Sequence, residues 1–324
     1  MTDLKSSGTG APDQKPPKSE RAFIEALARE LPDFASPHGF GDDLAPLEAR
    51  PGGLLWTTDM LMDGVDFLSS QHSWRQIGRK AMAVNLSDCA ASATIPVSAV
   101  CAVALNNAMS MDDALELYRG MRDCGLEHKC PITGGDTNSW DAPAVISITV
   151  AASPVPGLPP VKRSGAQPGD KIYLTGPVGG SILGRHLEPK PRIQVACAIN
   201  RGLSPHAMID ISDGLVVDLW HLCEASGCGA VLEEGRLHDV VHPDAEVLAK
   251  KTGRNPLEHA LYDGEDFELI VAVPARFEPD QCRQFGLTLI GEFRPNPAIF
   301  LHEPGRSPRQ LEIRGWEHFR DETH

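Results

Sequence analysis

The spacing of apolar residues along the chain predicts several helices. Helical periodicity covers residues 21–31, and Pro32 ends that predicted helix. A second helix is predicted from Ser73, because Gln76 three residues later completes a capping box before an apolar stripe. Ser110 begins a third helix by the same reasoning. Further helices are predicted near residue 181 and over 215–226 and 243–252.

Continuous apolar runs between these segments predict strands. The runs are short and are bounded by glycine, proline or acidic residues, which is typical of buried strands. They cover residues 53–58, 97–105, 131–133, 144–151, 171–175, 207–211 and 267–273. Asp59 is expected just beyond the first run, and Gly134, Gly135 and Asp136 are expected to follow the third. Helices and strands alternate in both halves, so the fold class is mixed α/β.

A proline-rich segment divides the chain into two predicted domains. Residues 153–160 contain four prolines and one glycine without helical or strand periodicity. We expect an N-terminal domain over residues 21–153 and a C-terminal domain over 154–324, each with its own core. Residues 1–20 are rich in Lys, Ser, Gly and Pro and predict a disordered tail.

Composition and charge exclude some classes of protein. The 324 residues carry a net charge of −14 with a pI near 5.3, and no basic stripe is present, so nucleic acid is not an expected partner. No secretory signal and no membrane-spanning run is visible. The eight cysteines form no C-x-x-C pair, and several lie in apolar runs, as is typical of buried thiols in a reducing compartment. We therefore expect a cytoplasmic protein.

Five short acidic motifs suggest the chemistry. Two carboxylates about 4 Å apart repel by about 4 kcal/mol at an effective dielectric near 20, so convergent aspartates need cations. Oxygen ligands select hard ions such as Mg²⁺. The alternative is that each aspartate merely caps a turn or a helix. The motifs contain seven aspartates: Asp42, Asp43, Asp59, Asp88, Asp136, Asp210 and Asp213.

Phosphoryl transfer suits such a set, because metal ions held by carboxylates neutralise and align phosphate groups. Thr57, Thr58 and Ser212 could add neutral oxygens, and Arg163 offers a planar fork for a phosphate. No serine or cysteine lies in a nucleophile-elbow context, and glycoside hydrolysis needs only two acids. The glycines of residues 176–180 match no nucleotide-binding loop; a plain turn and a phosphate contact both remain open.

With these motifs assembled, the sequence resembles the thiamine-monophosphate kinase family. The matching segments occur in the family's order over nearly the whole chain apart from the tail. They are GDDLAPL (41–47), TTD (57–59), RKAMAVNLSDCAA (79–91), ITGGDT (132–137), RSGAQPGDKIYLTG (163–176), IDISDGLVVDL (209–219) and GEDFEL (264–269). The resemblance implies a two-domain fold of the aminoimidazole-ribonucleotide-synthetase-like superfamily and a homodimer. It also implies direct transfer of the ATP γ-phosphate to thiamine monophosphate.

The resemblance also implies roles for individual residues. Catalytic roles fall on Asp88, Asp136 and Asp210. Mg²⁺ binding falls on Asp42, Thr57, Thr58, Asp59, Asp88, Asp136, Asp210 and Asp213. Contacts to ATP fall on Tyr118, Gly135, Asp136, Arg163 and Ser212. Substrate contacts fall on Asp66, Glu265 and Trp316, whose ring could stack on a thiamine ring.

One position departs from the family pattern. Members usually have a histidine before the phenylalanine of the segment after TTD, whereas here Asp66 precedes Phe67. An anion in that place would weaken binding of a phosphorylated substrate unless a metal or a shifted loop compensates. Two alternatives therefore stay open: a related enzyme that uses ATP on another acceptor, and a non-catalytic nucleotide-binding protein.

Overall fold

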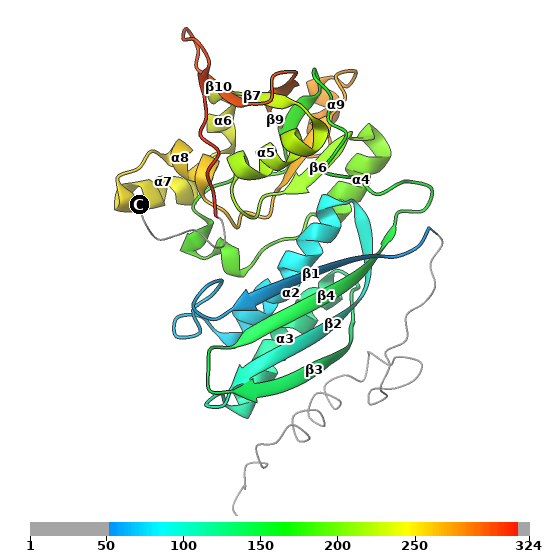
Figure 1. Ribbon diagram of the computed structural model, residues 1–324, viewed down its shortest axis with the longest axis vertical. Helices are drawn as coiled ribbons and strands as arrows, with labels where there is room; N and C mark the ends of the chain where they lie inside the picture. The colour runs from blue at the N-terminus through cyan, green and yellow to red at the C-terminus, as the bar shows by residue number, and fades with distance from the viewer. Residues whose placement is uncertain (1–51, 317–324) are drawn as a thin grey trace, which may run out of the picture.

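Two β-sheets with flanking helices form the protein, which confirms the mixed α/β class (Figure 1). The computed structural model describes residues 52–316. Asp42, Asp43, the predicted tail and the predicted helix over 21–31 lie outside the described residues. In the described part of the chain, no helix is both long enough and apolar enough to cross a bilayer.

The first sheet is built from residues 55–154 and has the strand order β1-β4-β2-β3. Its strands are β1 (Leu55–Met62), β2 (Thr94–Asn106), β3 (Ile132–Trp140) and β4 (Val145–Pro154). Strand β4 pairs antiparallel with β1 and β2, while β2 and β3 are parallel. Helices α2 (Trp74–Ala91) and α3 (Met111–Glu127) lie against one face of this sheet, and the other face is left open (Figure 1).

The second sheet has the order β11-β10-β7-β9-β5-β8-β6. Its strands are β5 (Lys171–Leu174), β6 (Ala207–Asp210), β7 (Gly229–Glu233), β8 (Leu269–Val273), β9 (Thr288–Arg294), β10 (Ile299–His302) and β11 (Arg309–Gln310). The helices around it are α4 (Ile193–Leu203), α5 (Leu215–Ser226), α6 (Glu234–Leu237), α7 (Pro243–Thr252), α8 (Pro256–Tyr262) and α9 (Pro279–Arg283). Three short 3₁₀ turns, η1 (Ser181–Leu183), η2 (Arg185–Leu187) and η3 (His238–Val240), complete the described elements.

Helix α2 begins where the sequence predicts. The Ser73 side chain accepts from the backbone of Gln76, and the Gln76 side chain accepts from the Ser73 backbone, so the capping box is confirmed. Ser110 likewise caps α3 by accepting from Asp113 N. These bonds satisfy backbone N–H groups that have no partner inside the helix.

Three sequence predictions about element boundaries were wrong. Strand β1 continues to Met62, so Asp59 lies inside it, because β1 pairs with β4 residue by residue over its whole length. Strand β3 includes Gly134, Gly135 and Asp136 for the same reason, through its pairing with β2. The helix expected near residue 181 consists only of the 3₁₀ turns η1 and η2.

A glycine contact lets helices α2 and α3 approach closely. A Cβ built on Gly78 would lie 1.9 Å from the Leu117 carbonyl oxygen, and one on Gly120 would lie 2.0 Å from the Arg75 carbonyl oxygen. No real Cβ tolerates such distances to backbone atoms, so both positions require glycine. The close crossing fixes α2, which carries several of the site residues.

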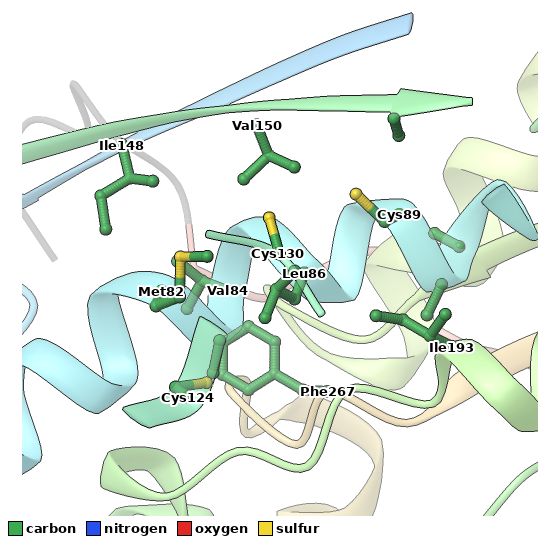
Figure 2. Close-up of a cluster of buried hydrophobic side chains, with 14 of the residues drawn as sticks. Met82, Val84, Leu86, Cys89, Cys124, Cys130, Ile148, Val150, Ile193 and Phe267 are labelled. Carbon is green, nitrogen blue, oxygen red and sulfur yellow. The ribbon is translucent and has the colours of Figure 1, made fainter. Parts of the chain in front are cut away.

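The apolar core continues from the first sheet into the C-terminal half. Ile193 of α4 and Phe267 belong to the same buried cluster as Leu86 and Cys89 of α2 (Figure 2). A second cluster fills the other side of the seven-stranded sheet, around Leu219 and Phe293. The expected independent cores are therefore partly merged, because α2 packs on α4 and β6 as well as on its own sheet.

We predict that Gly120→Ala lowers the free energy of unfolding by about 1–3 kcal/mol, because the added methyl group forces α3 away from the Arg75 carbonyl. Urea denaturation measures this. Gly235→Ala is the matched control, since a Cβ there meets nothing within 4 Å, and we expect a change within about 0.5 kcal/mol. Equal effects of the two substitutions would contradict the close-packing account.

Candidate active site

Strand β1 and helix α2 bring the first acidic residues together. Alternate β1 residues face α2, so Thr57 and Asp59 lie on the same side of the sheet. The Thr57 hydroxyl donates to the Asp88 carboxylate. The Asp59 N–H donates to Asn85 Oδ1 at 3.1 Å, and Asn85 is fully buried. Asn85 and Asp88, which lie on successive turns of α2, thus fix the position of the TTD segment (residues 57–59).

The C-terminal domain adds Asp210 to this group. Strand β6 ends at Asp210, which is 4% exposed. The hydroxyl of Ser87, the neighbour of Asp88 on α2, donates to Asp210 Oδ2 at 2.5 Å. Aspartates from β1, α2 and β6 therefore meet where the two halves of the chain pack together.

The electrostatics of these three aspartates favour a bound cation. Burial, together with the charges of Asp88 and Asp66, raises the pKa of Asp59 to about 7. Burial and the charge of Asp88 raise the pKa of Asp210 to about 7 as well. Burial also raises the pKa of Asp88, while the Thr57 hydrogen bond and the Arg163 charge act in the opposite direction.

The donor set fits magnesium bound together with phosphate. Across residues 52–316, no group of three His, Cys, Asp or Glu side chains is spaced so that it could hold a metal ion by itself. Mg²⁺ commonly takes one or two carboxylates and completes its shell with phosphate oxygens and water. Aspartates that come singly from β1, α2 and β6 match that requirement, and substrate phosphates would supply the remaining ligands.

A pocket of about 510 Å³ opens beside Asp88. Thr57 of β1 and the segment 159–163, including Arg163, line it, and Cys89 and Met208 form part of its apolar wall. This volume is within the range of small-molecule sites. Arg163 is exposed, and its charge lowers the pKa of Asp88. It therefore lies on the solvent side of the pocket, near the acidic residues.

The loop after β6 joins the remaining candidates. The Glu265 N–H donates to the Ser212 carbonyl oxygen at 2.7 Å, and the Trp316 N–H donates to the Asp213 carbonyl oxygen at 3.0 Å. A Cβ on Gly264 would lie 2.3 Å from the Ser212 oxygen, so the two loops touch. Ser212, Asp213, Glu265 and Trp316 therefore lie together, and Ser212 is only two residues beyond Asp210.

Lys80 is a residue that the sequence reasoning missed. Its side chain is 1% exposed, and Nζ donates to the Asp66 carbonyl oxygen at 2.5 Å and pairs with the Glu265 carboxylate. Lys80 therefore links α2 to the GEDFEL loop. The sequence feature that indicates a role for Lys80 is its place within the apolar part of α2, where burying an unpaired lysine would be costly.

The GEDFEL loop is held under backbone strain by ion pairs. Glu265 and Phe267 have φ values of +60° and +52°, in the left-handed region that is unfavourable for such residues. Arg185 pairs with Asp266, and Arg192 pairs with Glu268. The Gly179 N–H also donates to Asp266 at 2.8 Å, which favours the turn interpretation of the glycines at 176–180 over a phosphate contact.

The Asp66 carboxylate is used within its own loop. Its Oδ2 accepts the Met62 N–H at 2.7 Å, which closes the turn after β1. The Asp66 carboxylate is therefore partly compensated by a local hydrogen bond, whereas Lys80 contacts only the Asp66 backbone carbonyl oxygen.

Other candidates do not join this group within one chain. The Thr58 hydroxyl points to the opposite face of the sheet and donates to the Ile148 carbonyl oxygen. Gly135 lies level with Asp59 across β4 and β2, three strand spacings or about 14 Å away. Asp136 pairs with the exposed Ala102 at that far edge, and Tyr118 is buried on α3. The predicted Asp42 lies outside the described residues.

Known proteins are similar to this chain in sequence. Residues 41–153 match the domain family described as "AIR synthase related protein, N-terminal domain". The thiamine-monophosphate kinase of Rhodopirellula baltica is 41% identical over 262 residues, which cover 78% of this chain and 80% of that protein. The thiamine-monophosphate kinase of Aquifex aeolicus is 30% identical over 300 residues, covering 86% and 92%.

Solved structures share the fold. One described as "AaThiL complexed with AMPPCP and TMP" is 29% identical, with a TM-score of 0.73 over 93% of this chain and 97% of that one. The thiamine-monophosphate kinase of Stenotrophomonas maltophilia K279a gives a TM-score of 0.74 at 28% identity, covering 89% and 97%. The hydrogenase maturation protein HypE of E. coli, at 19% identity and a TM-score of 0.74, shares the fold alone.

We predict that the metal-free protein loses stability as pH rises from about 5 to about 8. An unfolded aspartate loses its proton near pH 3.9, whereas folded Asp59 and Asp210 keep theirs until about pH 7, so the folded state binds more protons in this range. Calorimetry in a chelator at the two pH values measures the change in Tm. Asp59→Asn should reduce the loss, and Asp239→Asn, on the exposed turn η3, should leave it unchanged. A pH-independent Tm for the parent protein would contradict the prediction.

Proposed function

The chain belongs to the thiamine-monophosphate kinase family, and on that premise we propose that it phosphorylates thiamine monophosphate with ATP and Mg²⁺ to give thiamine diphosphate. The proposal rests on one observation above all. Aspartates from both halves of the chain meet in one place, linked by the Thr57–Asp88 and Ser87–Asp210 hydrogen bonds. A cluster of aspartates suits a polyphosphate with bound metal ions better than it suits a neutral ligand.

The chain's own residues would bind and align the two substrates. Bound Mg²⁺ would neutralise phosphate charge and favour in-line transfer between phosphate oxygens. Asp59 and Asp88 would hold ions on one side, and Asp210 and Asp213 on the other. Arg163 would bind a phosphate through its planar fork at the mouth of the pocket. No covalent intermediate is needed, since the acceptor phosphate attacks the γ-phosphorus directly.

The acceptor would lie beside Glu265 and Trp316. Trp316 is 55% exposed, and an exposed indole suits stacking on an aromatic ring of thiamine. Lys80 fixes the position of the Glu265 carboxylate through a buried ion pair. The Asp66 carboxylate, bound to the Met62 N–H, is less repulsive toward a phosphate than a free anion would be. An alternative acceptor remains the second candidate, because Asp66 stands where the family has a histidine.

We further propose a homodimer in which a second copy completes the site. The open face of the first sheet exposes large apolar side chains, with Trp56 at 61%, Met60 at 60% and Trp140 at 45%. Such a patch favours a protein interface. Gly135 and Asp136 stand at the sheet edge far from Asp59, so a partner copy could present its own pair to the nucleotide. All eight cysteines are buried free thiols, which supports a reducing compartment such as the cytoplasm.

We predict that the purified protein converts thiamine monophosphate and ATP to thiamine diphosphate and ADP in equal amounts. A mass-spectrometric assay with saturating Mg²⁺ measures the products. Thiamine and a panel of other phosphorylated metabolites serve as comparison acceptors. Turnover of another panel member, with no thiamine diphosphate formed, would favour the alternative acceptor, and chelation of Mg²⁺ should abolish turnover in either case.

We predict that Asp88→Asn abolishes turnover with little loss of fold, because the amide keeps the side chain's size but loses the anion beside Thr57 and Arg163. We expect kcat to fall by about a hundredfold or more. Asp239→Asn, an exposed change on the turn η3, is the control. A near-normal kcat for Asp88→Asn would rule out the metal role assigned to this residue.

A further inference from the structure

We propose that Asp218 is a positioning residue that fixes the loop carrying Ser212 and Asp213, an inference that rests on the function proposed above. Asp218 lies in the first turn of α5 and is 1% exposed. A carboxylate buried so deeply needs compensating hydrogen-bond donors.

The donors are three consecutive backbone N–H groups. Ser212 N, Asp213 N and Gly214 N donate to the same oxygen, Asp218 Oδ2, at 3.1, 3.0 and 3.1 Å. The other oxygen, Oδ1, faces His221 Nδ1 at 3.7 Å. Gly214 has φ +132°, a backbone conformation open to glycine, and this allows three successive N–H groups to converge on one point.

The occupied donors decide what kind of ligand the loop can bind. Convergent backbone N–H groups before a helix ordinarily form an anion site, with phosphate as the common guest. Here the protein's own carboxylate fills that position. With these N–H groups engaged, the loop would contribute to the site through the Asp213 carboxylate and the Ser212 hydroxyl, oxygen groups that suit a metal ion. Asp218 therefore makes this loop a cation-binding rather than a phosphate-binding element.

The same loop connects the metal side of the site to the acceptor side. Its carbonyl oxygens hold the other substrate residues, since Ser212 O accepts from Glu265 N and Asp213 O accepts from Trp316 N. The three N–H groups point to Asp218 while these two carbonyls point to the acceptor loop and the C-terminal segment. A shift at Asp218 would therefore move groups for Mg²⁺, ATP and the acceptor together.

Amide hydrogen exchange tests this in the unaltered protein, without turnover. By NMR, the N–H groups of residues 212–214 should exchange slowly in the free protein, and Mg-ATP should add little protection. Fast exchange in the free protein, with protection only on adding Mg-ATP, would overturn the proposal. Because no acceptor is used, this outcome is independent of whether thiamine monophosphate is the substrate.

The variant Asp218→Asn tests the consequence for metal use. We expect the half-saturating Mg²⁺ concentration to rise by about tenfold or more, as for other residues that orient metal ligands, and the KM for the acceptor to rise with it. Glu224→Gln removes a charge from the exposed side of the same helix and should change neither.

A purely structural role predicts a different pattern. If Asp218→Asn lowered kcat in proportion to its folded fraction, measured by calorimetry, with the half-saturating Mg²⁺ concentration unchanged, the positioning role would be wrong. Should the variant fail to fold, fast exchange of the three N–H groups in the unaltered protein would still overturn the proposal, and slow exchange would support it.

Discussion

Repulsion among buried carboxylates is the constraint on which this structure depends. Asp59, Asp88 and Asp210 come from three elements in two halves of the chain. Burial raises the pKa values of all three, and the charge of Asp88 raises those of Asp59 and Asp210 further. A fold gains no stability from such a group by itself. The arrangement makes sense when divalent ions and phosphate oxygens complete it, which is the chemistry of ATP-dependent phosphoryl transfer.

Helix α2 is the element that makes the convergence possible. Its close crossing with α3 at Gly78 and Gly120 fixes its position on the first sheet. From that position Asp88 meets Thr57 of β1, Ser87 meets Asp210 of β6, and Lys80 reaches Glu265. Helix α2 thus fixes the position of the two halves of the chain relative to each other. The shared apolar core around Phe267 supports that contact (Figure 2).

Features of the fold that depend on local interactions could be predicted from the sequence. The capping box at Ser73 and the cap at Ser110 follow from side chains that bond their own helix. Strand ends could not be placed in the same way. Whether Asp59 belongs to β1 depends on its pairing with Ile148 of β4, nearly ninety residues away. The ion pair of Lys80 likewise depends on a partner 185 residues later.

The site shows the same division. The acidic motifs predicted phosphoryl transfer, which membership of the kinase family confirms, because carboxylate chemistry is visible in the residue types themselves. The dependence on a metal ion stays a prediction. That Thr58 faces away from Thr57 follows from strand alternation, once β1 is known to include both. Two contacts could be found only from the three-dimensional structure: the Asp66 carboxylate accepts a hydrogen bond within its own turn, and the Asp218 carboxylate accepts the N–H groups of the Ser212 loop.

The most direct test of the central claim is anomalous diffraction from crystals grown with Mn²⁺, a substitute for Mg²⁺, and a non-hydrolysable ATP analogue. The account predicts Mn²⁺ peaks that bridge the analogue's phosphates to Asp88 and to Asp210, with Asp59 or Asp213 completing the protein ligands. A bound nucleotide whose phosphates lie away from these carboxylates, with no metal peak between them, would contradict it.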